Sequence, residues 1–122
     1  MADGEGEMRR REQRNVYATI EADQTDLLVQ GTPNTLTIVS ATVTLKTKPA
    51  TGAGSVVGSI NDVPVTDFTS TASTKPECWF LLKPEVLSMA PGDYELTFLI
   101  VCSNGSTYEL VVIVTVLADD DP

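Results

Sequence analysis

Carboxylates are the residues of this chain that could do chemistry, either as calcium ligands or as an acid–base pair. The candidate oxygen ligands are three aspartates at positions 119–121 together with Asp62, Asp67 or Asp93. No loop has the spacing of a dedicated calcium site. Asp67 and Glu85 could form an acid–base pair, yet nothing in the sequence brings them together. We therefore expect a solvated acidic tail at residues 118–122 and no metal site.

Catalytic motifs are missing elsewhere as well. The chain contains no histidine, which removes Ser-His-Asp and Cys-His catalysis and imidazole metal sites. The stretch GAGSVVG at residues 52–58 lacks the Lys-Ser/Thr ending of a phosphate-binding loop, and no helix is expected after it. We predict that the protein is not an enzyme and that it uses no cofactor.

The two cysteines, Cys78 and Cys102, could form a disulfide. The charged N-terminus MADGEGEMRRREQR is not a secretory signal, so we expect synthesis in the cytosol and two buried thiols instead. Trp79 follows Cys78 directly, whereas immunoglobulin domains place a Trp well after the first cysteine of their pair. We expect Trp79 in the core or in a subunit contact rather than stacked on a ligand.

The charge of the chain argues against nucleic-acid binding. The net charge is −9 and the isoelectric point is near 4.2, whereas phosphate contacts need Lys and Arg. The only basic cluster consists of Arg9, Arg10, Arg11 and Arg14. Neighbouring glutamates dilute this cluster, so residues 1–15 are expected to form a flexible charged arm. No apolar run approaches the ~18 residues of a membrane-spanning helix, so no membrane contact is expected.

Strand patterns dominate the rest of the chain. Residues 35–48 are rich in Thr, Val, Ile and Leu, and Ala41, Val43 and Leu45 alternate there with polar residues. Further strand-like segments lie at residues 16–22, 26–31, 63–65, 78–82, 94–102 and 107–117. No helical stripe of any length occurs. The pattern predicts an all-β, immunoglobulin-like β-sandwich of six to eight strands over residues 16–117, preceded by an extended N-terminal arm.

Asn104-Gly105 between two apolar segments predicts a hairpin. If these residues are the centre of a two-residue turn, Phe98 faces Val111 and both faces of the hairpin are apolar. A two-layer sandwich buries only one face of each sheet, so residues 16–30 or another subunit must cover the second. The candidate partner-binding residues are Leu99, Val101, Tyr108, Leu110, Val112 and Val114, together with the four arginines.

Two segments resemble a known family. Residues 36–52, LTIVSATVTLKTKPATG, and residues 78–110, with a Pro-Glu turn and a Pro-Gly-x-Tyr hairpin, resemble small Ig-like domains of tailed-bacteriophage virion proteins. The usual glycine of the family's TGATV turn is Ser40 here. The baseplate members continue into fibre regions, whereas this chain stops at Pro122. A head-decoration or neck component is therefore favoured over a baseplate arm.

The resemblance implies a structural virion protein that stabilises the capsid or neck lattice without catalysis. Its partners would be major capsid or tail and neck proteins, and it would form a homo-oligomer, with a trimer as our expectation. It would be made in the host cytoplasm and located in the virion. The alternatives are a baseplate or tail-fibre attachment domain and a surface carbohydrate-binding or adhesion module.

Overall fold

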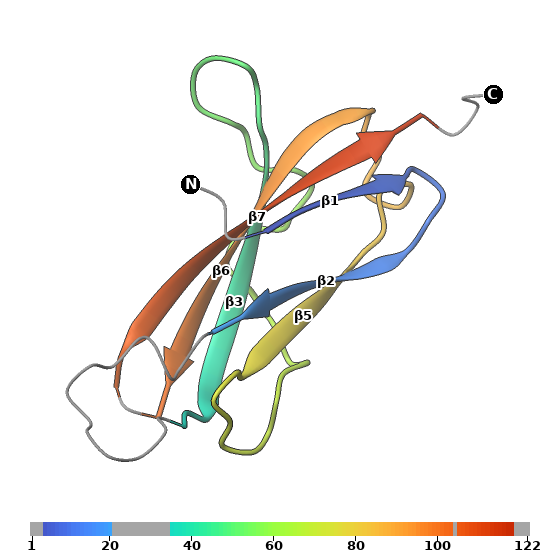
Figure 1. Cartoon of the computed structure of the whole chain (residues 1–122). Helices are drawn as coiled ribbons and strands as arrows, with labels where there is room; N and C mark the ends of the chain where they lie inside the picture. The colour runs from blue at the N-terminus through green and yellow to red at the C-terminus, as the bar shows by residue number, and fades with distance from the viewer. Residues whose placement is uncertain (1–3, 21–34, 104, 119–122) are drawn as a thin grey trace.

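Seven strands in two sheets form the fold in a computed structural model that describes residues 4–20, 35–103 and 105–118 (Figure 1). The strands are β1 (Gly4–Arg9), β2 (Arg14–Thr19), β3 (Ile38–Thr47), β4 (Val63–Pro64), β5 (Glu77–Leu82), β6 (Gly92–Cys102) and β7 (Thr107–Leu117). The all-β prediction is confirmed, and these residues contain no helix that could span a membrane. The expected segment at 26–31 and the aspartates at 119–121 lie outside the described residues.

The larger sheet has five strands in the order β1-β7-β6-β3-β4, and the smaller sheet pairs β2 with β5 (Figure 1). All neighbouring strands are antiparallel except β1 and β7, which are parallel. Residues 67–69 run along the other side of β5, where Trp79 N–H donates to the Asp67 carbonyl at 2.9 Å. The small sheet therefore has a short third segment beside β5.

The core lies between the two sheets and follows from the two-residue period of the strands. In β3 the predicted alternation is confirmed, because Ala41, Val43 and Leu45 are buried and the residues between them are not. The small sheet closes the core from the other side through Val16, Ala18, Ile20, Cys78 and Leu82, which are all buried. Residues 16–20 thus belong to the second layer and cover the inner face of the larger sheet, whereas our alternative had placed residues 16–30 over its other face.

The register of the β6–β7 hairpin differs by one residue from our prediction, which was wrong. Phe98 pairs with Leu110 and not with Val111. The turn is one residue longer than a two-residue turn: Cys102 N–H donates to the Ser106 carbonyl, and Gly105 N–H donates to the Cys102 carbonyl. Gly105 has a φ of 83°, in the left-handed region that glycine adopts at little cost.

This shift sorts the hairpin side chains into two unlike faces. The inner face consists of Tyr94, Leu96, Phe98, Ile100, Cys102, Tyr108, Leu110, Val112, Val114 and Val116. The outer face consists of Glu95, Thr97, Leu99, Val101, Thr107, Glu109, Val111, Ile113 and Thr115. The outer face is a mixture of polar and apolar residues. The hairpin therefore does not carry the second fully apolar face that we expected.

The N-terminal residues are also placed differently from the expected arm. Residues 4–9 form β1, which extends the larger sheet along β7, and Met8 of this strand is only 3% exposed. The sequence GEGEMR alternates glycine or methionine on the inner side with charged residues on the outer side. Glycine contributes no apolar side chain, so this alternation is invisible to a search for hydrophobic period.

Tyr94, at the start of β6, fixes the corner that leads into this strand. Its hydroxyl donates to the Ala90 carbonyl, four residues earlier, at 2.6 Å. The ring is buried in the core, and burial raises the pKa of the Tyr94 hydroxyl while the Ala90 bond lowers it by a smaller amount. This hydrogen bond ties the start of β6 to the turn that precedes it.

Met8→Ala tests whether β1 is part of the folded domain. Removing a buried methionine side chain should lower the free energy of unfolding by about 2–5 kcal/mol, measured by urea denaturation. Glu7→Ala, on the exposed side of the same strand, should change it by less than about 0.5 kcal/mol. Equal, small effects of the two substitutions would show that residues 4–9 do not pack against the sheet.

Tyr94→Phe tests the corner. Loss of the bond to the Ala90 carbonyl should lower the free energy of unfolding by about 0.5–1.5 kcal/mol. Tyr17→Phe is the matched control, because half of Tyr17 is exposed, and it should have almost no effect. A corner variant as stable as the control would contradict this role for Tyr94.

Candidate protein-interaction site

The small sheet presents an apolar outer surface. Along β5 the side chains of Cys78, Phe80 and Leu82 point to the core, so Trp79 and Leu81 point outward. Tyr17 of β2 pairs directly with Trp79, and their ring centroids lie 5.6 Å apart. Tyr17 is 50% exposed and Leu81 is 41% exposed. We call Tyr17, Trp79 and Leu81 the aromatic face.

A shallow pocket of about 240 Å³ borders the aromatic face. It is lined by Pro64, Val65, Thr66, Asp67, Trp79, Phe80, Leu81 and Lys83. Asp67 and Lys83 give it polar groups of both signs beside the Trp79 ring. Trp79 therefore lies at the surface, where it is available both to a protein partner and to a stacked ligand, and not in the core.

A second feature is the gap between β1 and β2, which are the end strands of the two sheets on one side of the sandwich. The two strands are joined by residues 10–13 but belong to different sheets (Figure 1). Their Cα atoms are more than 8 Å apart almost everywhere, compared with about 4.8 Å for hydrogen-bonded neighbours. We call this opening the β1–β2 gap.

Both strands turn backbone groups toward the gap. Arg10 N–H donates to the Leu117 carbonyl, and bonding groups alternate along a strand, so Glu5 and Glu7 point their N–H and C=O groups away from β7. Ile20 N–H donates to the Pro76 carbonyl, so by the same alternation Asn15 and Tyr17 point theirs away from β5. Within the described residues, no sheet pairing joins these two edges.

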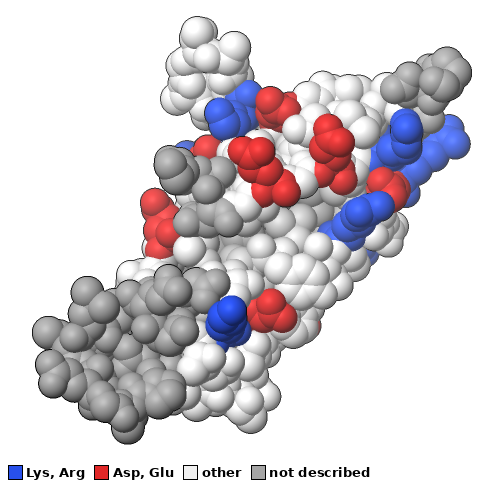
Figure 2. Space-filling view, viewed as in Figure 1, with Lys and Arg blue, Asp and Glu red and all other residues white. Residues whose placement is uncertain are grey.

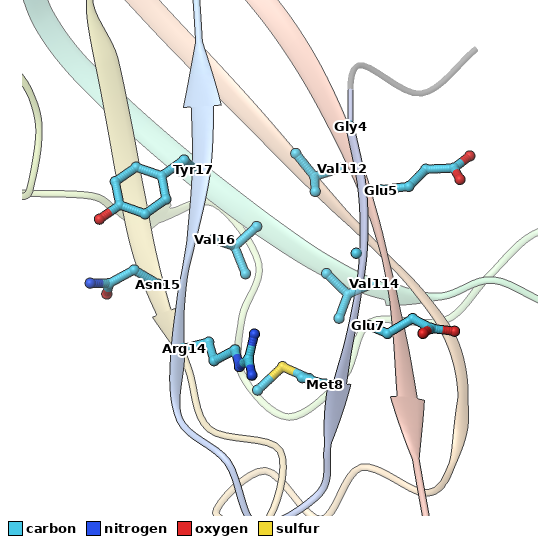
Figure 3. A pocket seen from close by; sticks show the side chains of 11 residues that line it. Gly4, Glu5, Glu7, Met8, Arg14, Asn15, Val16, Tyr17, Val112 and Val114 are labelled. Carbon is cyan, nitrogen blue, oxygen red and sulfur yellow. The ribbon is translucent and has the colours of Figure 1, made fainter.

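The gap has an apolar floor. It contains a pocket of about 250 Å³ lined by Gly4, Glu5, Gly6, Glu7, Met8, Arg14, Asn15, Val16, Tyr17, Val112 and Val114. Figure 3 shows Val16, Val112, Val114 and Met8 between the two strands, while Glu5 and Glu7 point away from them. A side chain on Gly6 would meet no atom within 4 Å of its first carbon. The two glycines therefore leave unfilled space above Val112 and Val114.

The four predicted arginines gather near the turn between β1 and β2, where Figure 2 shows a cluster of basic side chains. Arg9 donates to the Ala118 carbonyl and Arg10 to the Met89 carbonyl, both at 3.0 Å. Arg14 forms an ion pair with Glu12 at 2.8 Å, and Arg11 is exposed. Arg9 and Arg10 thus connect this turn to distant parts of the chain, whereas Arg14 pairs within the turn.

Glu12 stabilises this turn through hydrogen bonds with Arg9. It accepts a hydrogen bond from the Arg9 backbone N–H at 2.6 Å, and its own N–H donates to the Arg9 carbonyl at 3.0 Å. The backbone bond from Arg9, followed by the bond from the Arg14 side chain, lowers the pKa of Glu12. Both edge groups of Arg9 are therefore satisfied, so the open part of the β1 edge ends before this residue.

The predicted hairpin residues do not form one surface. Leu99 and Val101 lie on the outer face, where Leu99 is 41% exposed. Tyr108 and Leu110 are partly buried on the inner face, and Val112 and Val114 are buried there. The groove on the outer face, about 440 Å³, is lined by Thr44, Lys46, Asn61, Asp62, Glu95, Thr97, Leu99, Glu109 and Val111. Polar side chains dominate this groove.

The candidate carboxylates remain apart. Asp62 N–H donates to the Thr44 hydroxyl, Asp93 accepts a hydrogen bond from the Thr115 hydroxyl, and Asp67 lies beside β5. Glu85 lies in the turn after β5. Among the described residues, no group of three or more Asp, Glu, Cys or His side chains could hold a metal ion.

The two cysteines are free thiols and both are buried, as we predicted. Burial raises the pKa of Cys78 from 9.0 to about 12, and the nearby Glu77 carboxylate adds to this effect. Burial also raises the pKa of Cys102. Both thiols are therefore poor nucleophiles, since the thiolate is the reactive form.

No family model, curated protein or solved structure matches this chain. The class of protein must therefore be argued from the strand order and the surfaces. The aromatic face and the β1–β2 gap are features that the sequence did not reveal to us. The available signals were the uninterrupted apolar run CWFLL for the aromatic face and the alternation in GEGEMR for the β1–β2 gap.

The cysteines give a test of the packed core. Native protein at neutral pH should resist a thiol reagent and react fully in denaturant. Between pH 9 and 12 the folded state keeps the Cys78 proton that the unfolded chain loses, so this group makes the free energy of unfolding fall as pH rises. Cys78→Ala should show a shallower decline in this window. Rapid labelling of the native protein would contradict the buried placement.

Proposed function

We propose that this protein is a non-catalytic, immunoglobulin-like structural domain that joins a larger protein assembly. The strand order supports the finer fold assignment. Immunoglobulin sandwiches combine a C-F-G sheet with a sheet in which B neighbours E and E neighbours D. Here β3-β6-β7 corresponds to the first set, and β2-β5 with residues 67–69 corresponds to the second. The Tyr94 corner at the start of the F-like strand agrees with this assignment.

The observation that carries the proposal is that β5 is apolar on both sides. Its inner residues pack in the core, while Trp79 and Leu81 with Tyr17 form the exposed aromatic face. A two-layer sandwich offers no third layer to cover this surface. Tyr and Trp are also the residues most enriched at the energetic centres of protein interfaces. A protein partner on this face explains why the strand is apolar outside as well as inside.

We propose further that the assembly is the virion of a tailed bacteriophage. The support is the resemblance of residues 36–52 and 78–110 to Ig-like virion domains. The partners would be capsid, neck or tail proteins, and a homo-oligomer would present several aromatic faces to the lattice.

A carbohydrate-binding module is a second candidate. The stacked Tyr17 and Trp79 rings beside the pocket with Asp67 and Lys83 resemble the combination of aromatic surface and polar groups that binds sugars. This function predicts glycan binding by the isolated protein. The assembly function predicts binding to virion particles and no binding to glycans.

The double substitution Tyr17→Ser and Leu81→Ser tests the assembly function. Electron microscopy and co-sedimentation with purified particles of the phage that encodes the chain should show binding of the wild-type protein and loss of most binding by the variant. Val39→Ser is the matched control, because Val39 is 62% exposed on β3, away from the aromatic face, and it should bind normally. Equal binding by all three proteins would remove the aromatic face from the interaction. A strong glycan-array signal without particle binding would favour the second candidate.

A further inference from the structure

At the β1–β2 gap both sheets end in strands with open edges, and an unfilled apolar pocket lies between them. In the immunoglobulin arrangement, strand A lies beside B in the A-B-E-D sheet. Here the strand before β2 pairs with β7 instead, and the corresponding side of β2 has no strand among the described residues. Glu5 and Glu7 face the opening from β1 with their backbone groups, as Asn15 and Tyr17 do from β2.

We propose that the β1–β2 gap binds an extended segment of a partner protein, which pairs with β1 and β2 and links the two sheets. This inference rests on the proposed assembly function and names the chemistry of one partner. Main-chain hydrogen bonds to an exposed edge provide affinity in such strand addition, and side-chain pockets provide specificity. Because β1 and β2 run in opposite directions (Figure 1), the segment is parallel to one and antiparallel to the other.

The space in the gap suits one strand. A strand placed between β1 and β2 needs the two to be about 9–10 Å apart, and their Cα atoms are more than 8 Å apart almost everywhere, which is also the usual separation of two packed sheets. Gly4 and Gly6 have no side chains to occupy the 250 Å³ pocket. Val16, Val112 and Val114 form its apolar floor (Figure 3). Apolar side chains at alternate positions of the bound segment would fill this pocket.

Charge determines which side chains suit the positions of the segment that do not face the pocket. Its outward side chains would lie next to Glu5 and Glu7, which both point away from the gap (Figure 3). Opposite charges on neighbouring strands attract, and like charges on directly opposed positions repel. A segment with apolar residues over the pocket and basic residues beside Glu5 and Glu7 therefore fits, since the Arg14 side chain that also lines the pocket is paired with Glu12. A second copy of β1 would bring its own glutamates against these and does not fit.

The probe is a seven-residue acetylated peptide of alternating valine and lysine, VKVKVKV, and the matched peptide replaces each lysine with glutamate. Binding to the full chain is measured by NMR titration and by fluorescence anisotropy. We expect VKVKVKV to shift the amide signals of Glu5, Glu7, Asn15 and Tyr17 and to protect those amides from hydrogen exchange. The glutamate peptide should bind at least about tenfold more weakly.

Gly6→Val places a side chain in the pocket and should weaken binding of VKVKVKV at least about tenfold. The variant should fold, since the site is open and valine favours strands, and its thermal melt checks this. Thr42→Val, on the outer face of β3, is the matched control and should bind as the wild-type protein does. If Gly6→Val fails to fold, Glu7→Pro removes an edge N–H without removing a bond to β7 and should weaken binding similarly.

The proposal is overturned if VKVKVKV does not bind, if Gly6→Val or the glutamate peptide binds as well, or if the shifted amides lie elsewhere. It is also overturned if the protein alone dimerises in sedimentation velocity and Gly6→Val abolishes the dimer, because a second copy is then the occupant. Particle binding through the aromatic face does not depend on Gly6. If the peptide does not bind while particle binding is intact, the β1–β2 gap is not a binding site for a partner segment, and the proposed assembly function is unaffected.

Discussion

The two-residue period of a β-strand is the constraint on which this structure depends. Each strand turns alternate side chains to opposite faces, and two layers can bury only the faces between them. The inner residues of β3 and β6, such as Leu45 and Phe98, satisfy this rule against the small sheet. Where a strand is apolar on both sides, the rule leaves one side unsatisfied. In this chain that strand is β5, and the unsatisfied side is the aromatic face.

The same constraint explains why the β6–β7 hairpin does not leave an apolar face uncovered. Its inner face is continuous and apolar, but its outer face places Glu95 and Glu109 among Leu99, Val111 and Ile113. Isolated apolar side chains among polar neighbours are normal on protein surfaces. The uncovered apolar surface that suggests a partner is therefore not on the last two strands. It is on the small sheet, where aromatic side chains of two strands lie together.

Much of the fold could be predicted from the sequence, because alternation and turn chemistry are local. The extent of β3, the strands around Phe98 and Ile113, the buried thiols and the absence of helices in the described part all follow from such signals. The hairpin register could not be predicted, since Asn-Gly fits turns of two or three residues and only the hydrogen bond from the Cys102 N–H to the Ser106 carbonyl distinguishes them. β1 was missed because Gly4 and Gly6 occupy its inner positions. The aromatic face was missed because the apolar run CWFLL indicates burial without saying which side is covered.

Open strand edges are a hazard for a soluble protein, since they can template pairing between copies. This chain carries glutamates along the open edge of β1 and has a net charge of −9, so pairing of identical edges is opposed. The same glutamates do not repel a basic segment. They therefore oppose pairing with a second copy of β1 and favour pairing with a basic partner. Any homo-oligomer would then use a surface other than this edge. In the two proposals, the aromatic face contacts the larger assembly and the open edge of β2 takes a partner segment, so the two contacts use different sides of one small sheet.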